Sequence, residues 1–131
     1  MVAEREVLHT ESFGEQVYGF AQAVRVGGLI HVAGQTAMTD EGTILGEGDM
    51  ATQMRETYDA IERVLATFGA SCHDVVDETL FVTDYLAAAT VAREVREAVY
   101  GARLDVASTL VEVGSLGLPG MLIEIKCTAQ I

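Results

Sequence analysis

Hydrophobic and polar residues alternate strictly between positions 121 and 130, and this period of two predicts a β-strand. One face of the strand holds Met121, Ile123, Ile125, Cys127 and Ala129. The other face holds Leu122, Glu124, Lys126 and Thr128. The pattern leaves two interpretations of Glu124: a solvated residue on an open sheet face, or an acid in a pocket. In a pocket, partial burial would raise its pKa towards values useful for proton transfer.

Five further segments have the composition or alternation that is typical of strands. They span residues 4–10, 21–26, 29–38, 75–83 and 107–113. We expect the first to be an edge strand. The pair Gly27-Gly28 separates the second from the third, and two glycines between strand patterns predict a tight β-hairpin.

Two segments show the spacing and the end signals of helices. In the first, Asp49 is a candidate N-cap, and Gly69 is a candidate C′ residue at the other end. The apolar positions between them have helical spacing: Met50, Met54, Tyr58, Ile61 and Leu65. The second helix is predicted from about Asp84 to Tyr100 and is closed by Gly101.

The predicted order of elements is therefore βββαβαββ, an α+β fold with one mixed sheet. No linker or repeat interrupts residues 1–131, so we expect a single domain with both helices on one face of the sheet. The other face would be uncovered in a monomer. Half of the 131 residues are hydrophobic and the mean hydropathy is +0.28, which favours an oligomer that buries apolar surface between subunits.

Charge and residue content restrict the partners. A formal net charge of −12 disfavours binding to nucleic acid, whose phosphates the surface would repel. Cys72 and Cys127 are expected to be buried, reduced thiols, and the three histidines share no metal-ligand spacing. We therefore expect no metal and no cofactor. Neither a membrane-spanning segment nor a secretory leader is visible, so a cytoplasmic location is expected.

Short motifs in a fixed order resemble the Rid family over nearly the whole chain. These are the reactive intermediate deaminases, also called the YjgF or endoribonuclease L-PSP family. The matching segments are residues 22–24 (QAV), 32–35 (VAGQ), Gln53, 65–70 (LATFGA), 74–76 (DVV), 81–84 (FVTD), 107–113 (ASTLVEV) and 123–125 (IEI).

The resemblance implies a chorismate-mutase-like fold assembled as a homotrimer, with small-molecule sites in clefts between subunits. Characterised members hydrolyse imines or enamines to a carbonyl compound and ammonia without metal or cofactor. An arginine holds the substrate carboxylate, and a glutamate on the last strand orients the attacking water. That glutamate corresponds to Glu124 in this chain.

The chain departs from the deaminating members at four positions of the implied site. Ala107 stands at the position of the arginine, Ala92 replaces an asparagine, Phe20 replaces a tyrosine and Ala33 replaces a serine. Loss of a charged anchor of this kind costs about 2–5 kcal/mol of binding. We therefore expect a substrate unlike 2-aminoacrylate, in a cleft lined by Phe20, Ala33, Gly34, Ala92, Ala107 and Ser108, with Glu124 as the acid–base residue.

Two hypotheses follow from these departures. The first is hydrolysis of an imine or enamine that lacks a carboxylate, with Arg103 as a conceivable substitute cation. The alternative is a non-catalytic trimer that binds a metabolite or regulates a partner, because drift towards alanine is expected once chemistry is no longer selected. Ribonuclease activity, which one family name suggests, conflicts with the charge of −12.

Overall fold

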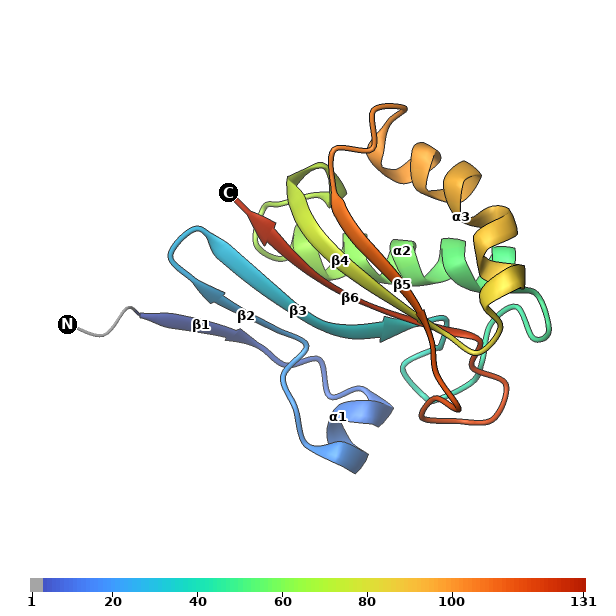
Figure 1. The fold of residues 1–131 in the computed structure, drawn as a ribbon. Coiled ribbons are helices and arrows are strands. Elements are labelled where there is room, and N and C mark those ends of the chain that lie inside the picture. Colours follow the sequence, from blue (N-terminus) through green and yellow to red (C-terminus); the bar gives the residue numbers. More distant parts are fainter. Residues whose placement is uncertain (1–3) are drawn as a thin grey trace.

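The computed structural model describes residues 4–131 and contains a six-stranded sheet with helices packed against it (Figure 1). The strands are β1 (Arg5–Leu8), β2 (Ala23–Val26), β3 (Leu29–Thr36), β4 (Val75–Val82), β5 (Ala107–Glu112) and β6 (Ile123–Gln130). The α-helices are α1 (Phe13–Tyr18), α2 (Met50–Ala66) and α3 (Tyr85–Tyr100), and one 3₁₀ turn covers Cys72–Asp74.

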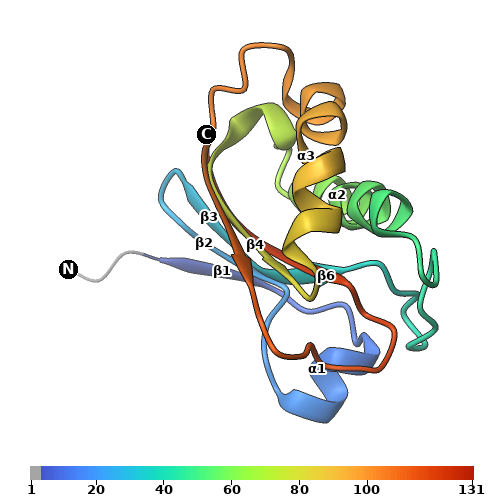
Figure 2. The same ribbon diagram turned by 45° about the vertical axis from the view of Figure 1, so that its right-hand side comes forward.

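The sheet is mixed, as the sequence predicts. Its strand order is β1-β2-β3-β6-β4-β5, so β1 is an edge strand and the C-terminal strand lies in the middle. Only β4 and β5 are parallel, and they are joined by α3; the other neighbours are antiparallel. Helices α2 and α3 lie side by side on the same face of the sheet, which confirms the predicted α+β arrangement (Figure 2).

The core forms between that face and the two helices. Along β6, Ile123, Ile125, Cys127 and Ala129 are buried, as the alternation predicts. The apolar positions of α2 meet them, and Met54, Tyr58, Ile61 and Leu65 are almost completely buried. Each such side chain stabilises the fold by about 1.5–3 kcal/mol relative to an exposed position. Both cysteines are free and buried.

Polar caps and a left-handed glycine set the helix ends. The side chains of Asp49 and Asp84 accept hydrogen bonds from backbone N–H groups three residues on, which confirms both as N-caps. Regular helix ends at Ala66, three residues before Gly69. Gly69 has a φ of +74° and donates to Ala66 O, while Ala70 donates to Leu65 O. This hydrogen-bond pair is a Schellman motif, with Gly69 at C′ as predicted. Within residues 4–131, no helix has both the length and the apolar character needed to cross a membrane.

Helix α1 is absent from the predicted order βββαβαββ. It begins after Ser12, whose hydroxyl accepts from Glu15 N while the Glu15 carboxylate accepts from Ser12 N. This is a capping box, and the sequence pattern Ser-x-x-Glu could have indicated it. The helix has only six residues and too little apolar periodicity to predict a helix from spacing alone.

Candidate functional site

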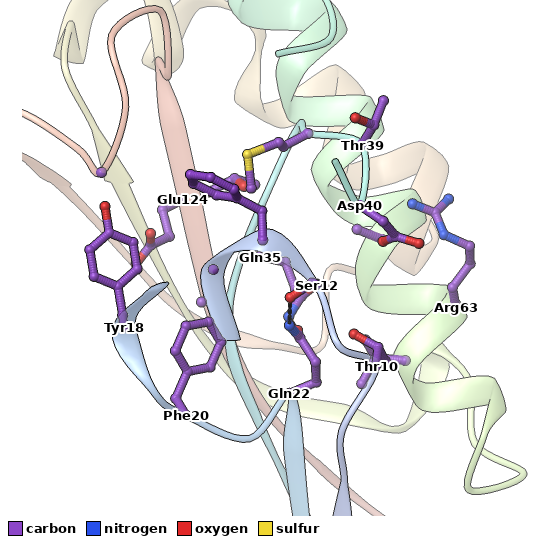
Figure 3. A pocket seen from close by; sticks show the side chains of 18 of the residues that line it. Thr10, Ser12, Tyr18, Phe20, Gln22, Gln35, Thr39, Asp40, Arg63 and Glu124 are labelled. Atoms are coloured by element: carbon purple, nitrogen blue, oxygen red, sulfur yellow. Dashed lines mark hydrogen bonds between the residues drawn. The ribbon is translucent and has the colours of Figure 1, made fainter. Parts of the chain in front are cut away.

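A pocket of about 340 Å³ opens where α1, the end of β3, β6 and one side of α2 come together (Figure 3). This volume suits a small organic ligand. Its apolar wall includes Leu8, Phe13, Phe20, Met38, Leu118 and Met121. Its polar lining includes Thr10, Ser12, Gln22, Gln35, Thr36, Thr39, Asp40, Arg63 and Glu124. Such a mixture of apolar surface and a few polar groups is typical of ligand sites.

Glu124 reaches the pocket from the beginning of β6, where it pairs with Thr36 of β3 and Phe81 of β4. Its side chain is half-buried, and this burial raises the pKa of the carboxyl group, an effect that Lys126 partly offsets. Within residues 4–131, the carboxylate has neither a hydrogen bond nor an ion pair. It is therefore available to a ligand, and proton transfer is easier than for an ordinary surface carboxylate.

Gly34 provides the space that the Glu124 side chain occupies. A register shift between Val32 and Gln35 interrupts the pairing of β3 with β6 and brings Gly34 under the carboxylate. A β-carbon built on Gly34 would overlap with the Glu124 carboxylate and would lie 2.7 Å from its Cδ. Any larger residue at position 34 would therefore displace the carboxylate.

A second carboxylate, Glu15, organises the polar wall of the pocket. Its side chain is buried and accepts hydrogen bonds from the Thr10 hydroxyl (2.6 Å), the Thr10 amide (3.0 Å), the Gln22 side chain (3.1 Å) and His9 Nδ1 (2.9 Å). Burial opposes ionisation of Glu15, but these hydrogen bonds outweigh it and lower the pKa to about 2. Glu15 is therefore ionised at neutral pH.

Two glutamines extend this polar wall towards Glu124. Gln22 Nε2 donates to Glu15 and to Ser12 Oγ (2.9 Å), the second of which Figure 3 shows. Gln35 Nε2 donates in turn to Gln22 Oε1 (2.7 Å) and to the carbonyl of Ala33 (3.1 Å). The network joins α1, the residue that precedes β2, and β3, and it fixes the rotamers of both pocket glutamines.

The structure brings part of the predicted site together. Phe20, Gly34 and Glu124 all line the pocket, and Ala33 is next to Gly34 in β3. Ala107 lies elsewhere in the chain, at the exposed start of β5 opposite Asp77, whereas Glu124 is opposite Phe81. Asp77 and Phe81 are four positions apart, which corresponds to about 13 Å along a strand.

Two predicted residues lie on the helix side of the sheet. Ala92, on α3, packs against the hydrophobic core. Ser108 donates from its hydroxyl to the buried carboxylate of Glu78 at 2.5 Å. Neither lines the pocket of Glu124 within one chain, so their role as cleft residues stays a prediction.

The Glu78 cluster is a polar centre that sequence reasoning missed. The carboxylate is fully buried and also accepts from Tyr58 Oη, Tyr100 Oη and Arg96 Nε, each at 2.7 Å. Burial and the adjacent carboxylate raise the pKa of both tyrosines far above the ordinary value. Glu78, Leu80 and Val82 occupy alternate positions of β4 and therefore share one face. The apolar character of Leu80 and Val82 is the sequence signal that this face, and Glu78 with it, is buried.

The arginine that lines the pocket is Arg63 and not Arg103, the substitute considered from the sequence. Arg103, the conceivable substitute for the missing arginine, pairs with Asp105 at 3.1 Å, and both side chains are exposed. It does not line the pocket. Arg63 of α2 does, and Figure 3 shows it with Asp40 on the side away from Phe20. Residues 4–131 contain no cluster of three or more His, Cys, Asp or Glu side chains that could hold a metal ion.

Known proteins match this chain in sequence and in structure. Rv2704 from Mycobacterium tuberculosis, described as a member of the YjgF/YER057c/UK114 family, is 34% identical, with a TM-score of 0.83 over 98% of this chain and 100% of that one. RidA from an Antarctic Psychrobacter is 25% identical, with a TM-score of 0.80 over 96% and 99% of the two chains. The RutC family protein slr0709 of Synechocystis is 30% identical over 131 residues, covering 96% of each chain.

Two further relatives match over a shorter segment. The RutC family proteins of Pyrococcus abyssi and Pyrococcus horikoshii are 34% and 28% identical over 80 residues, and the matches span 63% and 64% of their lengths. The family described as Endoribonuclease L-PSP matches residues 14–131. This range contains every element of the fold except β1 and the first residue of α1. The chain therefore belongs to the endoribonuclease L-PSP family, also called the YjgF or Rid family.

Proposed function

We propose that this protein hydrolyses a small imine or enamine to a carbonyl compound and ammonia, with Glu124 as the acid–base residue. The observation that carries the proposal is the environment of Glu124: half-buried, raised in pKa, free of a fixed partner and open to a pocket of about 340 Å³. A carboxylate that only served solubility would more often lie in full solvent or in an ion pair, for example with Lys126.

The proposed reaction needs one proton acceptor that later becomes a donor. The Glu124 carboxylate takes a proton from water as the water oxygen bonds to the C=N carbon. The nitrogen receives that proton, giving a carbinolamine. The C–N bond then breaks, the hydroxyl proton passes to the leaving nitrogen, and ammonia departs from the carbonyl product. The balance is one imine and one water to one carbonyl compound and one ammonia.

The chain's own residues favour a substrate without a carboxylate. Ala107 offers no charge, and its direct neighbour across the sheet is Asp77. A substrate anion at this place would meet a carboxylate instead of a guanidinium, and like charges in close contact are unfavourable. An apolar or cationic group would meet no such penalty.

The cleft would be completed in a homotrimer. Within residues 4–131, no helix covers most of the sheet face opposite α2 and α3 (Figure 2). The apolar side chains of Leu29 and Val111 are more than one-third exposed. Glu124 and Ala107 are also too far apart along the sheet to serve one small ligand in a single chain. Light scattering should give a mass of about 42 kDa, three times the 14.0 kDa of one chain. A monomer in solution would contradict the shared cleft.

Ammonia release tests the reaction. An amine oxidase would generate imines that lack a carboxylate, and an amino-acid oxidase would generate imines that carry one. We expect faster ammonia release from the first class when the protein is present, and no acceleration with Glu124→Gln. The matched control is Glu112→Gln, since Glu112 lies outside the pocket. Equal acceleration by wild type and Glu124→Gln, or none by either, would refute the proposal.

The alternative is a trimer that binds a metabolite without turnover. The specific observation in its favour is that Ala107 pairs with Asp77. The position at which the deaminating members carry an arginine for the substrate carboxylate therefore has neither a positive charge nor a polar side chain. Saturable ligand binding together with no ammonia release from either imine class would favour this alternative.

A further inference from the structure

In the pocket wall, Gln35 donates a hydrogen bond to Gln22, and Gln22 donates to Glu15. The charge of Glu15 determines this donor-to-acceptor direction. With a pKa of about 2 its carboxylate is ionised, so it only accepts hydrogen bonds. Gln22 must therefore turn its amide nitrogen towards Glu15, and both hydrogens of that nitrogen are used, by Glu15 and by Ser12. The oxygen of Gln22 consequently points the other way.

The same reasoning determines the orientation of the Gln35 side-chain amide. Because the Gln22 oxygen is an acceptor, Gln35 must present its nitrogen there, at 2.7 Å. The second hydrogen of that nitrogen is directed to the carbonyl of Ala33. Both donors of Gln35 are thus occupied, and a reversed amide would place two oxygens against each other at 2.7 Å. The orientation follows from the chemistry of the network alone.

The side-chain oxygen of Gln35 is left as an acceptor at the pocket. Gln35 is only 9% exposed, it lines the pocket, and its oxygen accepts no hydrogen bond from residues 4–131. We propose that this oxygen receives an N–H group of the ligand, so that the pocket selects nitrogen donors such as imines, amines and primary amides. This inference rests on the proposed function, because it names the ligand chemistry of the same pocket.

Gln35 and Glu124 both line the pocket. Gln35 pairs with Ile125 and Glu124 with Thr36 across β3 and β6, so the two side chains leave the sheet from adjacent rows on opposite faces. The inference therefore concerns the Gln35 oxygen alone. The unpartnered Gln35 oxygen is open to the pocket, since no unpartnered side-chain oxygen or nitrogen is buried within residues 4–131. A ligand that covered this oxygen and offered only oxygen acceptors would leave it unpaired, which is unfavourable.

Two probes with the same phenylacetyl group distinguish a ligand with an N–H donor from one without. Phenylacetamide carries N–H groups, and methyl phenylacetate has none. Nuclear magnetic resonance titration of the wild-type protein measures both dissociation constants. One neutral hydrogen bond corresponds to about two- to tenfold in affinity, so the amide should bind tighter by that factor. Equal affinities, a preference for the ester, or no binding of the amide would each overturn the inference.

Variants assign the preference to Gln35. In Gln35→Met the amide-to-ester ratio should fall to about one while ester affinity is retained. In Gln22→Met the freed Gln35 amide can rotate, and the ratio should fall as well. Gln16→Met is the matched control, since Gln16 is exposed and does not line this pocket, and it should keep the wild-type ratio. An unchanged ratio in Gln35→Met would overturn the assignment.

The wild-type ratio decides the inference even when a variant does not fold. The probes are not imines, so this measurement is independent of ammonia release. Equal probe affinities with active hydrolysis would reject the role of Gln35 alone. A clear amide preference with no hydrolysis would reject the proposed reaction alone.

Discussion

Replacement of Glu78 by glutamine should destabilise the protein strongly. The buried carboxylate holds four donors, two on each oxygen: Tyr58 and Tyr100 on Oε1, and Arg96 and Ser108 on Oε2. Glutamine removes the charge and turns one acceptor into a donor. The Arg96 side chain, which is 14% exposed, would then keep an unneutralised charge. Removing one partner of a buried ion pair costs about 3–5 kcal/mol, a large part of the about 5–15 kcal/mol typical of a domain.

Urea unfolding followed by circular dichroism measures this loss, at a fixed protein concentration so that any association equilibrium is the same in each sample. Glu97→Gln is the matched control, because Glu97 pairs with Arg93 one helical turn away on the exposed side of α3. A pair of that kind contributes about 0.3–0.5 kcal/mol.

A loss below about 1 kcal/mol for Glu78→Gln would refute the reasoning, because the cluster would then be worth no more than an exposed pair. The double variant Glu78→Gln with Arg96→Met should lose less than the sum of the two single variants, since the charge of Arg96 is no longer buried alone. Additive losses would mean that the two side chains do not act together.

Three further predictions concern the pocket. Gly34→Ala should displace the Glu124 carboxylate and reduce the rate of imine hydrolysis at least tenfold, which is ~1.4 kcal/mol in the barrier. Gly114→Ala is the control and should keep the wild-type rate, because a β-carbon there meets no atom within 4 Å. Equal rates for the two variants would refute the steric argument. The pKa of Glu15 falls from 4.5 to about 2 on folding, so its stabilisation is complete above pH 4.5 and is lost as the pH falls towards 2; Glu15→Gln should flatten the decline of the melting temperature across that range. The pKa of Glu124 is raised instead, so its ionisation opposes folding as the pH rises; Glu124→Gln should raise the melting temperature at neutral pH but not in acid.

Much of the fold could be predicted because the signals are local. The β6 alternation, the aspartate N-caps of α2 and α3 and the glycine after α2 each specify one element without reference to the rest of the chain. Helix α1 was missed because its signal is a capping box in a segment too short for periodicity. The sequence analysis did not single out Glu78, although its alternation with Leu80 and Val82 places it on the buried face of β4.

The site was harder to predict than the fold for a physical reason. Glu124 could be singled out because it lies between apolar residues in the strand pattern and because the family resemblance implies an acid–base residue at that position. The network from Glu15 through Gln22 to Gln35 could not be found, because its hydrogen bonds join side chains from three elements and depend on rotamers. The distance between Ala107 and Glu124 likewise depends on strand register, which no local pattern specifies.

Ala107 and Ser108 are consecutive residues of β5 with separate tasks. The hydroxyl of Ser108 holds the strand to Glu78 on the helix side, while the methyl group of Ala107 lies exposed on the other face. Position 107 can therefore be exchanged, for an arginine or for an apolar residue, without loosening the strand that carries it. Under the proposed function, a single substitution at position 107 would therefore change ligand preference while leaving the folding of β5 almost unchanged.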